Sequence, residues 1–400
     1  GLVAERPASR RARLLVLGAG PSQLGLLEAA HARPDLHVIA LDADPQAPGF
    51  AFADERAIVS SEDEPAVDRL ARAREIDGIV SPGADWPVGI AARIAERIGL
   101  PHPIDGRTAA IATSKARQRE RFASVGIPHA RAFALDDPAR PFPCVVKAPD
   151  RSGQRGLTFV RSRGGLDAAV AVATAQSRTG GVLVEEHIDG PEVTVNAVSV
   201  DGVFHPLAVT DRLTAEQPAF GVALAHVWPS LHDTRPVVEV ARSAVEAVGI
   251  RHGPSYTQLR LGSDGPSVIE VAARIGGGHD AELVEAVTGV ELNALAVACA
   301  VGEPLAIDHR PQDAVAAAIV FLVPPVGVLR EVHGLDDARS VAGVVWVRSY
   351  RRAGHVFGPL RRGPDRAGAV LAVGATRDEA LERGRRAAQA VRFAIDASPP

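Results

Sequence analysis

The sequence is short of cysteine, and this scarcity limits the kinds of site that it can build. Only two cysteines, Cys144 and Cys299, occur in 400 residues. They lie far apart and have no histidine partners at ligand spacing, so we expect neither a disulfide framework nor a zinc site. Sparing use of cysteine fits a reducing compartment. We therefore expect a cytoplasmic protein.

Long apolar runs and a dominant charge are also absent from the sequence. No apolar run reaches the roughly 18 to 20 residues that a membrane span requires, so we expect no membrane partner. The formal net charge is −4, and acidic and basic residues are interspersed along the chain. A chain without a basic field offers no electrostatic footprint for nucleic acid. Small molecules are therefore the expected partners.

Aromatic residues are scarce, at 4% of the chain, whereas hydrophobic residues make up 46%. The cores must therefore be built mainly from Val, Leu, Ile and Ala. Because 400 residues exceed one typical hydrophobic core, we expect two or three domains.

The first part of the chain alternates short apolar strands with helical patterns. The predicted elements, in order, are a strand over 13–17, a glycine turn at Gly18–Gly25, a helix over 24–32, a strand over 37–41, a helix over 66–74, a strand over 78–80 and a helix over 88–98. Their order contains a βαβ unit. The pattern predicts a doubly wound α/β domain over residues 1–105.

The remaining residues mix strands and helices in an α+β order. From 106 to 310 we expect a helix over 109–125, strands at 144–147, 157–160 and 182–186, helices at 166–175, 237–247, 281–288 and 292–301, and two hairpins turning at Asp201-Gly202 and Asp264-Gly265. From 311 to 400 we expect strands at 314–322, 344–350 and 370–373 and a last helix over 377–393. These two regions complete the expected division into three parts.

The segment Pro266–Asp280 carries the clearest chemical signal. An apolar strand presents Glu270 four residues before Arg274, and a triple glycine turn follows. An ionised acid between Ile269 and Val271 needs a partner if it is buried. An acid that can bind metal ions beside an arginine that can hold an anionic oxygen suggests phosphoryl chemistry from a magnesium nucleotide.

Two further segments fit a nucleotide. Lys147 ends an apolar strand, where an unpaired buried ammonium would be costly, although a lysine reaching the surface is the plain alternative. The loop Ser152–Gly156 follows it with glycines whose amides can bind phosphate. A strand then ends in Glu185 and Glu186, bends after His187 and Ile188, and presents Glu192. Taken singly, each of these acids is better explained as a solvated surface residue, and only their occurrence together in this order favours a nucleotide site.

The turn at Gly18–Gly25 leaves a different function open. Glycines before a helix let the backbone approach a pyrophosphate, and Asp42 or Asp44 after the next strand could hold a ribose. The third glycine is displaced from the usual dinucleotide spacing, so this signal is weak. A nicotinamide-dependent oxidoreductase, a structural turn and a site for a second substrate all remain open.

In this order, these motifs resemble the ATP-grasp superfamily of carboxylate ligases, in particular the L-amino-acid ligases and the biotin carboxylase group. The resemblance covers essentially the whole chain. It implies an ATP-grasp fold of α/β and α+β type. This fold would have a doubly wound pre-ATP-grasp domain at 1–105, an ATP-grasp domain at 106–310 with a lid at about 130–190 and an antiparallel-sheet region at 311–400.

The resemblance also implies roles for particular residues. Lys115 and Lys147 would contact ATP phosphates, and the remaining nucleotide contacts would come from Ser152, Gly153, Gln154, Gly156, Glu185, Glu186, His187, Ile188 and Glu192. Family members usually hold two magnesium ions with an acid on one strand and Glu-x-Asn-x-Arg on the next. Here these positions carry Gln258 and Glu270-Val-Ala272-Ala-Arg274, so Glu270 is the one charged ligand of that set. Mg²⁺ is the expected ion, with Mn²⁺ as an alternative.

The implied function is a Mg-ATP-dependent carboxylate–amine ligase. Glu270, Lys147 and Arg274 would be catalytic and would form an acyl phosphate that an amine then attacks. Candidate substrate residues are Arg274, Gly276, Gly277, Gly278, His279, Asp280, Asp211, Arg212, His226 and Arg330. The substrates would be a small carboxylic or amino acid and an amine. A homodimer is a further expectation.

Three alternatives to the ligase stay open. One is a carboxylase or purine-pathway enzyme of the same superfamily, although no biotinyl segment is visible in a chain without methionine. A second is the oxidoreductase that would use the Gly18–Gly25 turn. The third is a nucleotide-binding regulatory module that lost catalysis with Ala272.

Overall fold

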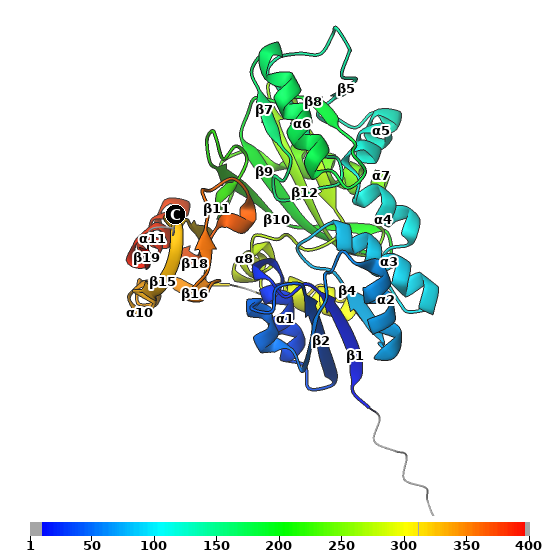
Figure 1. Cartoon of the computed structure of the whole chain (residues 1–400). Helices are drawn as coiled ribbons and strands as arrows, with labels where there is room; N and C mark the ends of the chain where they lie inside the picture. The colour runs from blue at the N-terminus through cyan, green and yellow to red at the C-terminus, as the bar shows by residue number, and fades with distance from the viewer. Residues whose placement is uncertain (1–9, 311, 397–400) are drawn as a thin grey trace, which may run out of the picture.

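Four β-sheets organise residues 10–310 and 312–396, the residues that this computed structural model describes (Figure 1). A parallel sheet lies at the bottom of the view, a small sheet at the top, and an eight-stranded sheet between them. A three-stranded sheet near the C-terminus lies at the left. The mixed α/β and α+β fold predicted from the sequence is confirmed.

The N-terminal part is a parallel sheet with helices on both faces. Its strands run in the order β3-β2-β1-β4, with bounds Ala12–Leu17 for β1, Leu36–Asp42 for β2, Glu55–Ile58 for β3 and Gly78–Val80 for β4. Along β1, Leu14 and Val16 pack in a cluster with α1 (Leu24–His31). The alternating Leu15 and Leu17 pack with α2 (Glu64–Ala73) and α3 (Trp86–Ile98). This two-sided alternation makes the sheet doubly wound, as predicted, although the edge strand β3 was not predicted.

The predicted helix over 109–125 is wrong, because two helices occupy these residues. They are α4 (Gly106–Ala112) and α5 (Lys115–Val125). Ser114 between them is extended, and its side chain accepts a hydrogen bond from the backbone N–H of Arg117 at 3.3 Å. Serine satisfies the free amides at a helix start better than it fits a helix interior. The break places Lys115 in the first turn of α5.

A small antiparallel sheet, here called the lid sheet, spans residues 132–186. Its order is β5-β8-β6-β7, with β5 Ala132–Phe133, β6 Cys144–Lys147, β7 Thr158–Val160 and β8 Leu183–Glu186. Helix α6 (Leu166–Gln176) packs on it through a separate cluster that includes Val146, Ala169 and Val184. The lid sheet therefore has its own core.

The central sheet has the order β13-β12-β9-β10-β11-β14-β18-β16. The bounds are β9 Glu192–Val200, β10 Val203–Thr214, β11 Ala223–Trp228, β12 Gly253–Gly262 and β13 Gly265–Ala272. The hairpin at Asp201-Gly202 is confirmed: both residues have positive φ, which a tight turn of this kind requires. Helix α7 (Thr234–Val248) packs its apolar side against this sheet. Strand β11 was not predicted.

The C-terminal residues continue the same sheet and add a second one. Strands β14 Ala316–Leu322, β18 Gly368–Gly374 and β16 Val344–Ser349 extend the central sheet, whereas β17 Val356–Phe357, β15 Gly327–His333 and β19 Arg392–Asp396 form the three-stranded sheet. The helices here and before are α8 Asp280–Thr288, α9 Leu292–Ala300, α10 Leu335–Arg339 and α11 Arg377–Ala390. The predicted last helix is wrong at its end. Because Phe393 and Ile395 pack with Leu329 and Phe357, residues 392–396 pair with β15 as a strand.

Within 10–310 and 312–396, no single helix is both long and apolar enough to cross a membrane. One bent pair, α8 with α9, passes the test of length and composition only when the two helices are taken together across a 118° bend.

The capping role of Ser114 gives a stability prediction. Replacing Ser114 with Ala should lower the free energy of unfolding by about 1 kcal/mol, because an amide at the start of α5 loses its acceptor. Urea unfolding followed by circular dichroism measures this change. Ser124→Ala is the matched control, since the exposed Ser124 hydroxyl only donates to the Arg121 carbonyl within the same helix. Equal stability of Ser114→Ala and the wild type would contradict the capping role.

Candidate active site

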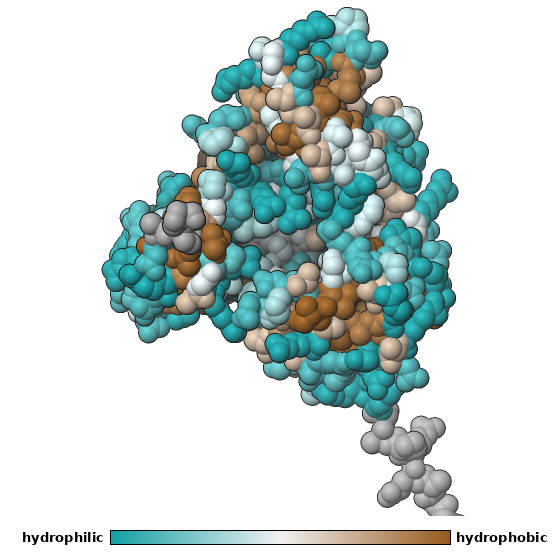
Figure 2. All heavy atoms as spheres, in the orientation of Figure 1, coloured by the Kyte–Doolittle hydropathy of each residue, from teal (hydrophilic) through white to brown (hydrophobic). Residues whose placement is uncertain are grey.

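A cleft of about 380 Å³ lies where the N-terminal sheet, the lid sheet, the central sheet and the C-terminal residues meet. All four parts line it, for example through Ser22, Arg155, Glu270 and Arg366. A smaller cavity of about 40 Å³ lies between the lid sheet and the central sheet and shares Gln154 and Gln258 with the cleft. Figure 2 shows mostly hydrophilic residues around a central hollow of the molecule.

Glu270 and Gln258 are neighbours across the β12–β13 ladder and both line the cleft. The ammonium Nζ of Lys115 lies 3.2 Å from Glu270 Oε1 and donates to the Arg151 carbonyl at 2.7 Å. Burial acts to raise the pKa of Glu270, but Lys115 and other neighbours outweigh it and lower that pKa to about 2. Glu270 is therefore an ionised carboxylate that lies beside the side-chain amide of Gln258.

Arg274 forms an ion pair with a residue that the sequence analysis did not select. Its Nε donates to Asp85 Oδ1 at 2.6 Å, and its Nη1 donates to the Ile275 carbonyl at 3.0 Å. Asp85 comes from the N-terminal part, in the segment between β4 and α3. Burial raises the pKa of Asp85 to about 6 against the opposing effect of Arg274. No sequence signal joins these residues, because they lie 189 positions apart.

Lys147 belongs to a buried charge cluster between the lid sheet and α5. It contacts Glu185, and Arg119 Nη2 lies 2.9 Å from the same carboxylate. All three side chains are buried. Burial lowers the pKa of Lys147, whereas Arg119 and Lys147 keep the pKa of Glu185 low in spite of burial. Lys147 and Glu185 line the smaller cavity, as do Glu186, His187 and Ile188.

Both carboxylate oxygens of Glu192 are bound by neighbouring side chains of the protein. Arg212 donates to its Oε2 at 2.6 Å, Gln258 Nε2 donates to the same oxygen at 2.9 Å, and Arg260 pairs with its Oε1. Arg212 was predicted to hold substrate, yet it pairs with Glu192 and donates to the Gly221 carbonyl at 2.8 Å while it lines the cleft. These residues fix the wall that the cleft and the smaller cavity share.

The loop of residues 152–156 after β6, here called the lid loop, lines the cleft. Gly153, Gln154 and Gly156 have φ values of 65°, 64° and 69°. A Cβ at Gly156 would lie 2.9 Å from Gln176 Cβ in that strained conformation, so glycine is required there. Ser152, Gly153 and Gln154 line the cleft, and Gly156 lies behind them.

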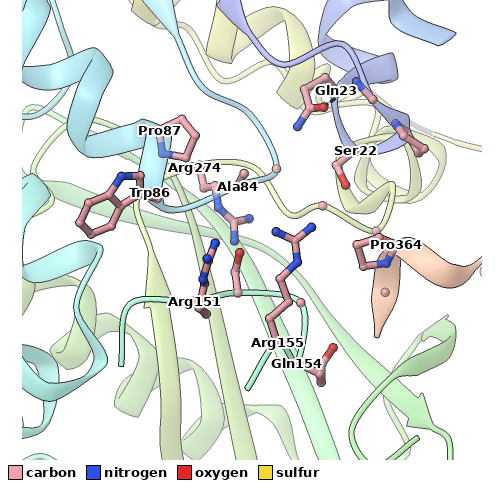
Figure 3. A pocket seen from close by; sticks show the side chains of 18 of the residues that line it. Ser22, Gln23, Ala84, Trp86, Pro87, Arg151, Gln154, Arg155, Arg274 and Pro364 are labelled. Carbon is pink, nitrogen blue, oxygen red and sulfur yellow. Dashed lines mark hydrogen bonds between the residues drawn. The ribbon is translucent and has the colours of Figure 1, made fainter. Parts of the chain in front are cut away.

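The cationic side chains of this part of the cleft converge. Figure 3 shows Arg151, Arg155 and Arg274 directed into the same space. Burial and the neighbouring Arg362 and Arg151 lower the pKa of Arg155. Within 10–310 and 312–396, Arg155 has no carboxylate oxygen within 4.0 Å. The space between these groups is therefore suited to an anion.

The glycines after Arg274 allow a close approach of the cleft walls. A Cβ at Gly278 would lie 2.6 Å from His226 Nε2, and one at Gly277 would lie 3.0 Å from the Gly83 carbonyl oxygen. His226, Gly277 and Gly278 line the cleft. Burial lowers the pKa of His226 to about 4, so its imidazole is neutral at pH 7.

His279 and Asp280 lie behind this wall instead of facing the cleft. His279 precedes α8 with φ 63°, and its ring contacts Tyr350 and Arg348. Asp280 Oδ2 accepts the Gly278 N–H at 3.2 Å, and Asn196 donates to Oδ1 at 3.4 Å. A Cβ at Gly276 would lie 2.3 Å from Asp280 Oδ2. These residues therefore shape the glycine turn from behind.

Like His279 and Asp280, the predicted substrate residues Arg330 and Asp211 do not line the cleft. Arg330 is an exposed side chain of β15 whose Nη1 lies 2.9 Å from Asp396. Asp211 accepts from Ser230 Oγ at 2.5 Å and the Leu231 N–H at 2.9 Å, and pairs with Arg377 at 3.0 Å. The sequence indicated only their charge, whereas the fold uses both in local ion pairs. The substrate assignments of Arg330 and Asp211 are corrected accordingly.

Arg366 was missed by the sequence analysis. Its guanidinium carbon lies 3.6 Å from the Phe321 ring centroid, and it donates to the carbonyls of Ala223 at 3.0 Å and Gly363 at 2.9 Å. In the described part of the chain no carboxylate oxygen lies within 4.0 Å of it, and burial lowers its pKa to about 10. Arg366 lines the cleft, and no local sequence pattern marks it.

The Gly18–Gly25 turn forms another wall of the cleft. Gly20 and Ser22 line it, but Asp42 accepts the Ala19 N–H at 2.9 Å and the Asp44 N–H at 2.9 Å. The Asp42 carboxylate therefore fixes the turn itself. Asp42 and Asp44 both line the cleft as well.

Comparisons with known proteins agree with this architecture. Residues 140–282 match the model of the ATP-grasp domain, and residues 320–396 match that of L-amino acid ligase C-terminal domain 2. A phosphoribosylamine–glycine ligase of Streptomyces coelicolor is 30% identical over 66% of this chain and 67% of its own length. A formate-dependent phosphoribosylglycinamide formyltransferase of Burkholderia vietnamiensis is 29% identical over 95% of each chain.

Solved structures show the same fold. The crystal structure of an L-amino acid ligase from Bacillus licheniformis superposes with a TM-score of 0.81 at 23% identity, covering 97% of this chain and 100% of that one. The chain belongs to the ATP-grasp superfamily of ADP-forming ligases. Its C-terminal residues are those of the L-amino acid ligase type, so the resemblance found in the sequence is confirmed.

The buried Lys147–Glu185–Arg119 cluster gives a second prediction. Glu185→Ala should destabilise the chain by about 3 to 5 kcal/mol, because it leaves two buried cations without their carboxylate. Glu186→Ala, at the next position, should cost at most about 1 kcal/mol, since Glu186 pairs with the exposed Arg131. Denaturant unfolding measures both. Similar losses for the two variants would contradict the assigned role of Glu185.

Proposed function

We propose that the chain is a Mg-ATP-dependent carboxylate–amine ligase that works through an acyl phosphate. The observation that carries this proposal is the convergence of ionised Glu270 with Lys115 and Arg274 where the cleft meets the lid loop. Phosphoryl transfer needs positioning and neutralisation of charge more than covalent help from the protein. In an ATP-grasp chain, a Glu270 carboxylate next to Lys115 and Arg274, with Asp85 paired to Arg274, fits that need.

The donor set suits magnesium. Carboxylate Glu270 and the amide oxygen of Gln258 are oxygen ligands, which Mg²⁺ prefers while it keeps several waters. Among the described residues, no group of three or more His, Cys, Asp or Glu side chains could hold an ion, so Gln258 and water would complete the coordination. Bound magnesium would supply positive charge to the phosphate oxygens. The use of Mn²⁺ stays a prediction.

The proposed reaction balances in two steps. A carboxylate oxygen of the substrate attacks the γ-phosphorus of ATP, an O–P bond forms, and the bond from that phosphorus to the bridging oxygen breaks to release ADP. The amine nitrogen then attacks the acyl carbon, phosphate leaves, and the nitrogen loses a proton. Lys115 would neutralise transferring phosphate charge, and Arg274 would hold an acyl phosphate oxygen.

The smaller cavity is proposed as the site of the adenine base. His187 lies there with Phe220, and their ring centroids are 5.8 Å apart. A cavity of about 40 Å³ has room for only a few water molecules. Entry of the nucleotide would therefore require the lid sheet to move away from the central sheet, which fits the proposed role of residues 130–190 as a lid.

The substrate carboxylate is proposed to bind near Arg366. The buried guanidinium of Arg366 lines the cleft and has no carboxylate partner in the described part of the chain. A bound anion would supply the missing partner for this charge. The C-terminal match to L-amino acid ligases favours an amino acid. The relatives that carry phosphoribosyl names favour the alternative of a purine-pathway ligase. The domain boundaries, the cytoplasmic location and the homodimer stay predictions.

Release of ADP and phosphate tests the proposed function. Purified protein is incubated with Mg-ATP and a panel of amino acids and small carboxylic acids, alone and in pairs, including formate with phosphoribosylglycinamide. We expect release that requires one acid together with one amine. Glu270→Gln should reduce that release about 100-fold or more, because the carboxylate beside the phosphates loses its charge.

Glu239→Gln is the matched control, since Glu239 lies on α7 with an exposed side chain that pairs with Arg242. It should retain the rate of the wild type. Circular dichroism should show that Glu270→Gln is folded. A near-normal rate for Glu270→Gln, or ATP binding without turnover for the whole panel, would contradict the proposal and favour a binding-only protein.

Arg366 should act mainly on the acid substrate. Arg366→Gln should raise KM for the carboxylic acid about 10- to 100-fold, because a charged hydrogen bond to the carboxylate is lost. The KM for ATP should change little. Steady-state kinetics with each substrate varied in turn separates the two effects, and an equal rise of both KM values would contradict this assignment.

A further inference from the structure

Asp85 stands at the start of a helix but does not cap it. Asp63 and Asp105 precede α2 and α4, and their side chains accept the backbone N–H groups of Ala66 at 3.1 Å and Thr108 at 2.8 Å. Asp85 makes no such bond before α3. Pro87 has no N–H to donate, and the N–H of Val88 is bonded to the carbonyl of Asp85 itself at 2.9 Å. The Asp85 carboxylate is therefore not needed by its own helix.

The Asp85 carboxylate instead binds an arginine from a distant part of the chain. Its Oδ1 accepts Arg274 Nε at 2.6 Å, and both residues are only 8% exposed. Asp85 belongs to the N-terminal part, between β4 and α3, whereas Arg274 lies two residues after the end of β13 in the central sheet. A hydrogen bond between two charged groups is short and strong, and a buried guanidinium without a partner is costly. The pair therefore fixes Arg274 to the N-terminal part.

The hydrogen bonds of Arg274 to the protein leave its Nη2 group available to a ligand. Nε is held by Asp85 and Nη1 by the Ile275 carbonyl, so these two directions are fixed. Within the residues that the structure describes, Nη2 donates to no protein acceptor. Figure 3 shows this guanidinium directed into the cleft beside Arg151. Two bonds to the protein thus orient a third donor toward the cleft.

Asp85 also keeps Arg274 away from a competing acid. Glu270 interacts with Arg274 and directly with the Asp85 carboxylate, and it pairs with Lys115 at 3.2 Å. Without Asp85, the long arginine side chain would be free to turn toward Glu270. An Arg274–Glu270 pair would occupy both the anion-binding donor and the carboxylate proposed for magnesium.

We propose that Asp85 is a positioning residue that sets the orientation of Arg274 toward the acyl phosphate. This inference rests on the proposed ligase function. The N-terminal sheet thereby contributes to the catalytic centre without touching the reacting atoms. Arg274 has its productive orientation only while α3 is seated against the central sheet.

Kinetics of single and double variants test the proposal. Asp85→Ala should lower kcat about 10- to 100-fold, as expected when a catalytic group is misplaced by about an ångström. The dissociation constant for ATP, measured by calorimetry, should stay within about twofold. In the Arg274→Ala background, Asp85→Ala should lower kcat no further, because the group through which it acts is gone.

Two other variants distinguish a loss of positioning from a loss of folding. Asp85→Asn keeps the size of the side chain and an acceptor oxygen, and it should lower kcat in the same direction but less. Asp105→Ala is the matched control, since it removes an N-cap aspartate remote from the cleft. It should lower Tm and leave kcat unchanged. Wild-type kcat in Asp85→Ala, or losses that add to that of Arg274→Ala, would overturn the proposal.

A spectroscopic measurement separates this inference from the proposed function. In ¹⁵N spectra of arginine Nε–Hε groups, the Arg274 signal is assigned by its absence in Arg274→Ala. We expect slow exchange with water in the wild type and faster exchange with a shifted signal in Asp85→Ala. An unchanged signal overturns the positioning role, even if the wild type ligates nothing. Wild-type inactivity with the expected change in this signal would overturn the proposed function alone.

Discussion

Carboxylates at one edge of the N-terminal parallel sheet hold the other parts of the molecule around the cleft. Asp85 binds Arg274 of the central sheet at 2.6 Å, Glu62 binds Arg178 beside the lid sheet at 2.7 Å, and Asp44 lies 3.5 Å from Arg351 near the C-terminus. Each acid follows a strand of that sheet, at the carboxyl ends where parallel sheets bind ligands. The shape of the cleft therefore depends on these ion pairs.

The same pairs control the charge of the cleft. Arginines line it from several parts of the chain, and most of them are neutralised by an acid from another part. In the described residues, Arg155 and Arg366 lack such a partner, and burial lowers the pKa of both. The local excess of positive charge lies on the lid loop and on the C-terminal side. An anionic ligand that reaches both sides would replace interactions that the protein does not make with itself.

Local patterns in the sequence predicted most helices and strands, and they also selected several residues that line the cleft, such as Glu270 and Arg274. The apolar strand that ends at Lys147 and the hairpin turn at Asp201-Gly202 were predicted because their signals lie within a few residues. The pairing of Asp85 with Arg274 and the exposure of Arg366 to the cleft were not found, because each depends on segments that meet only after folding. For the same reason the predicted last helix ran on to residue 393, although pairing with β15 makes residues 392–396 a strand.

The central sheet has a consequence for how the chain can be divided. The predicted boundary at residue 310 falls between β11 and β14, which are hydrogen-bonded neighbours in one continuous sheet. A fragment ending there would expose the backbone donors and acceptors of β11 and the apolar faces that cover Ala317 and Ile319. An open strand edge of that kind recruits other strands and leads to aggregation. The C-terminal residues are therefore part of the same folding unit as strands β9 to β13.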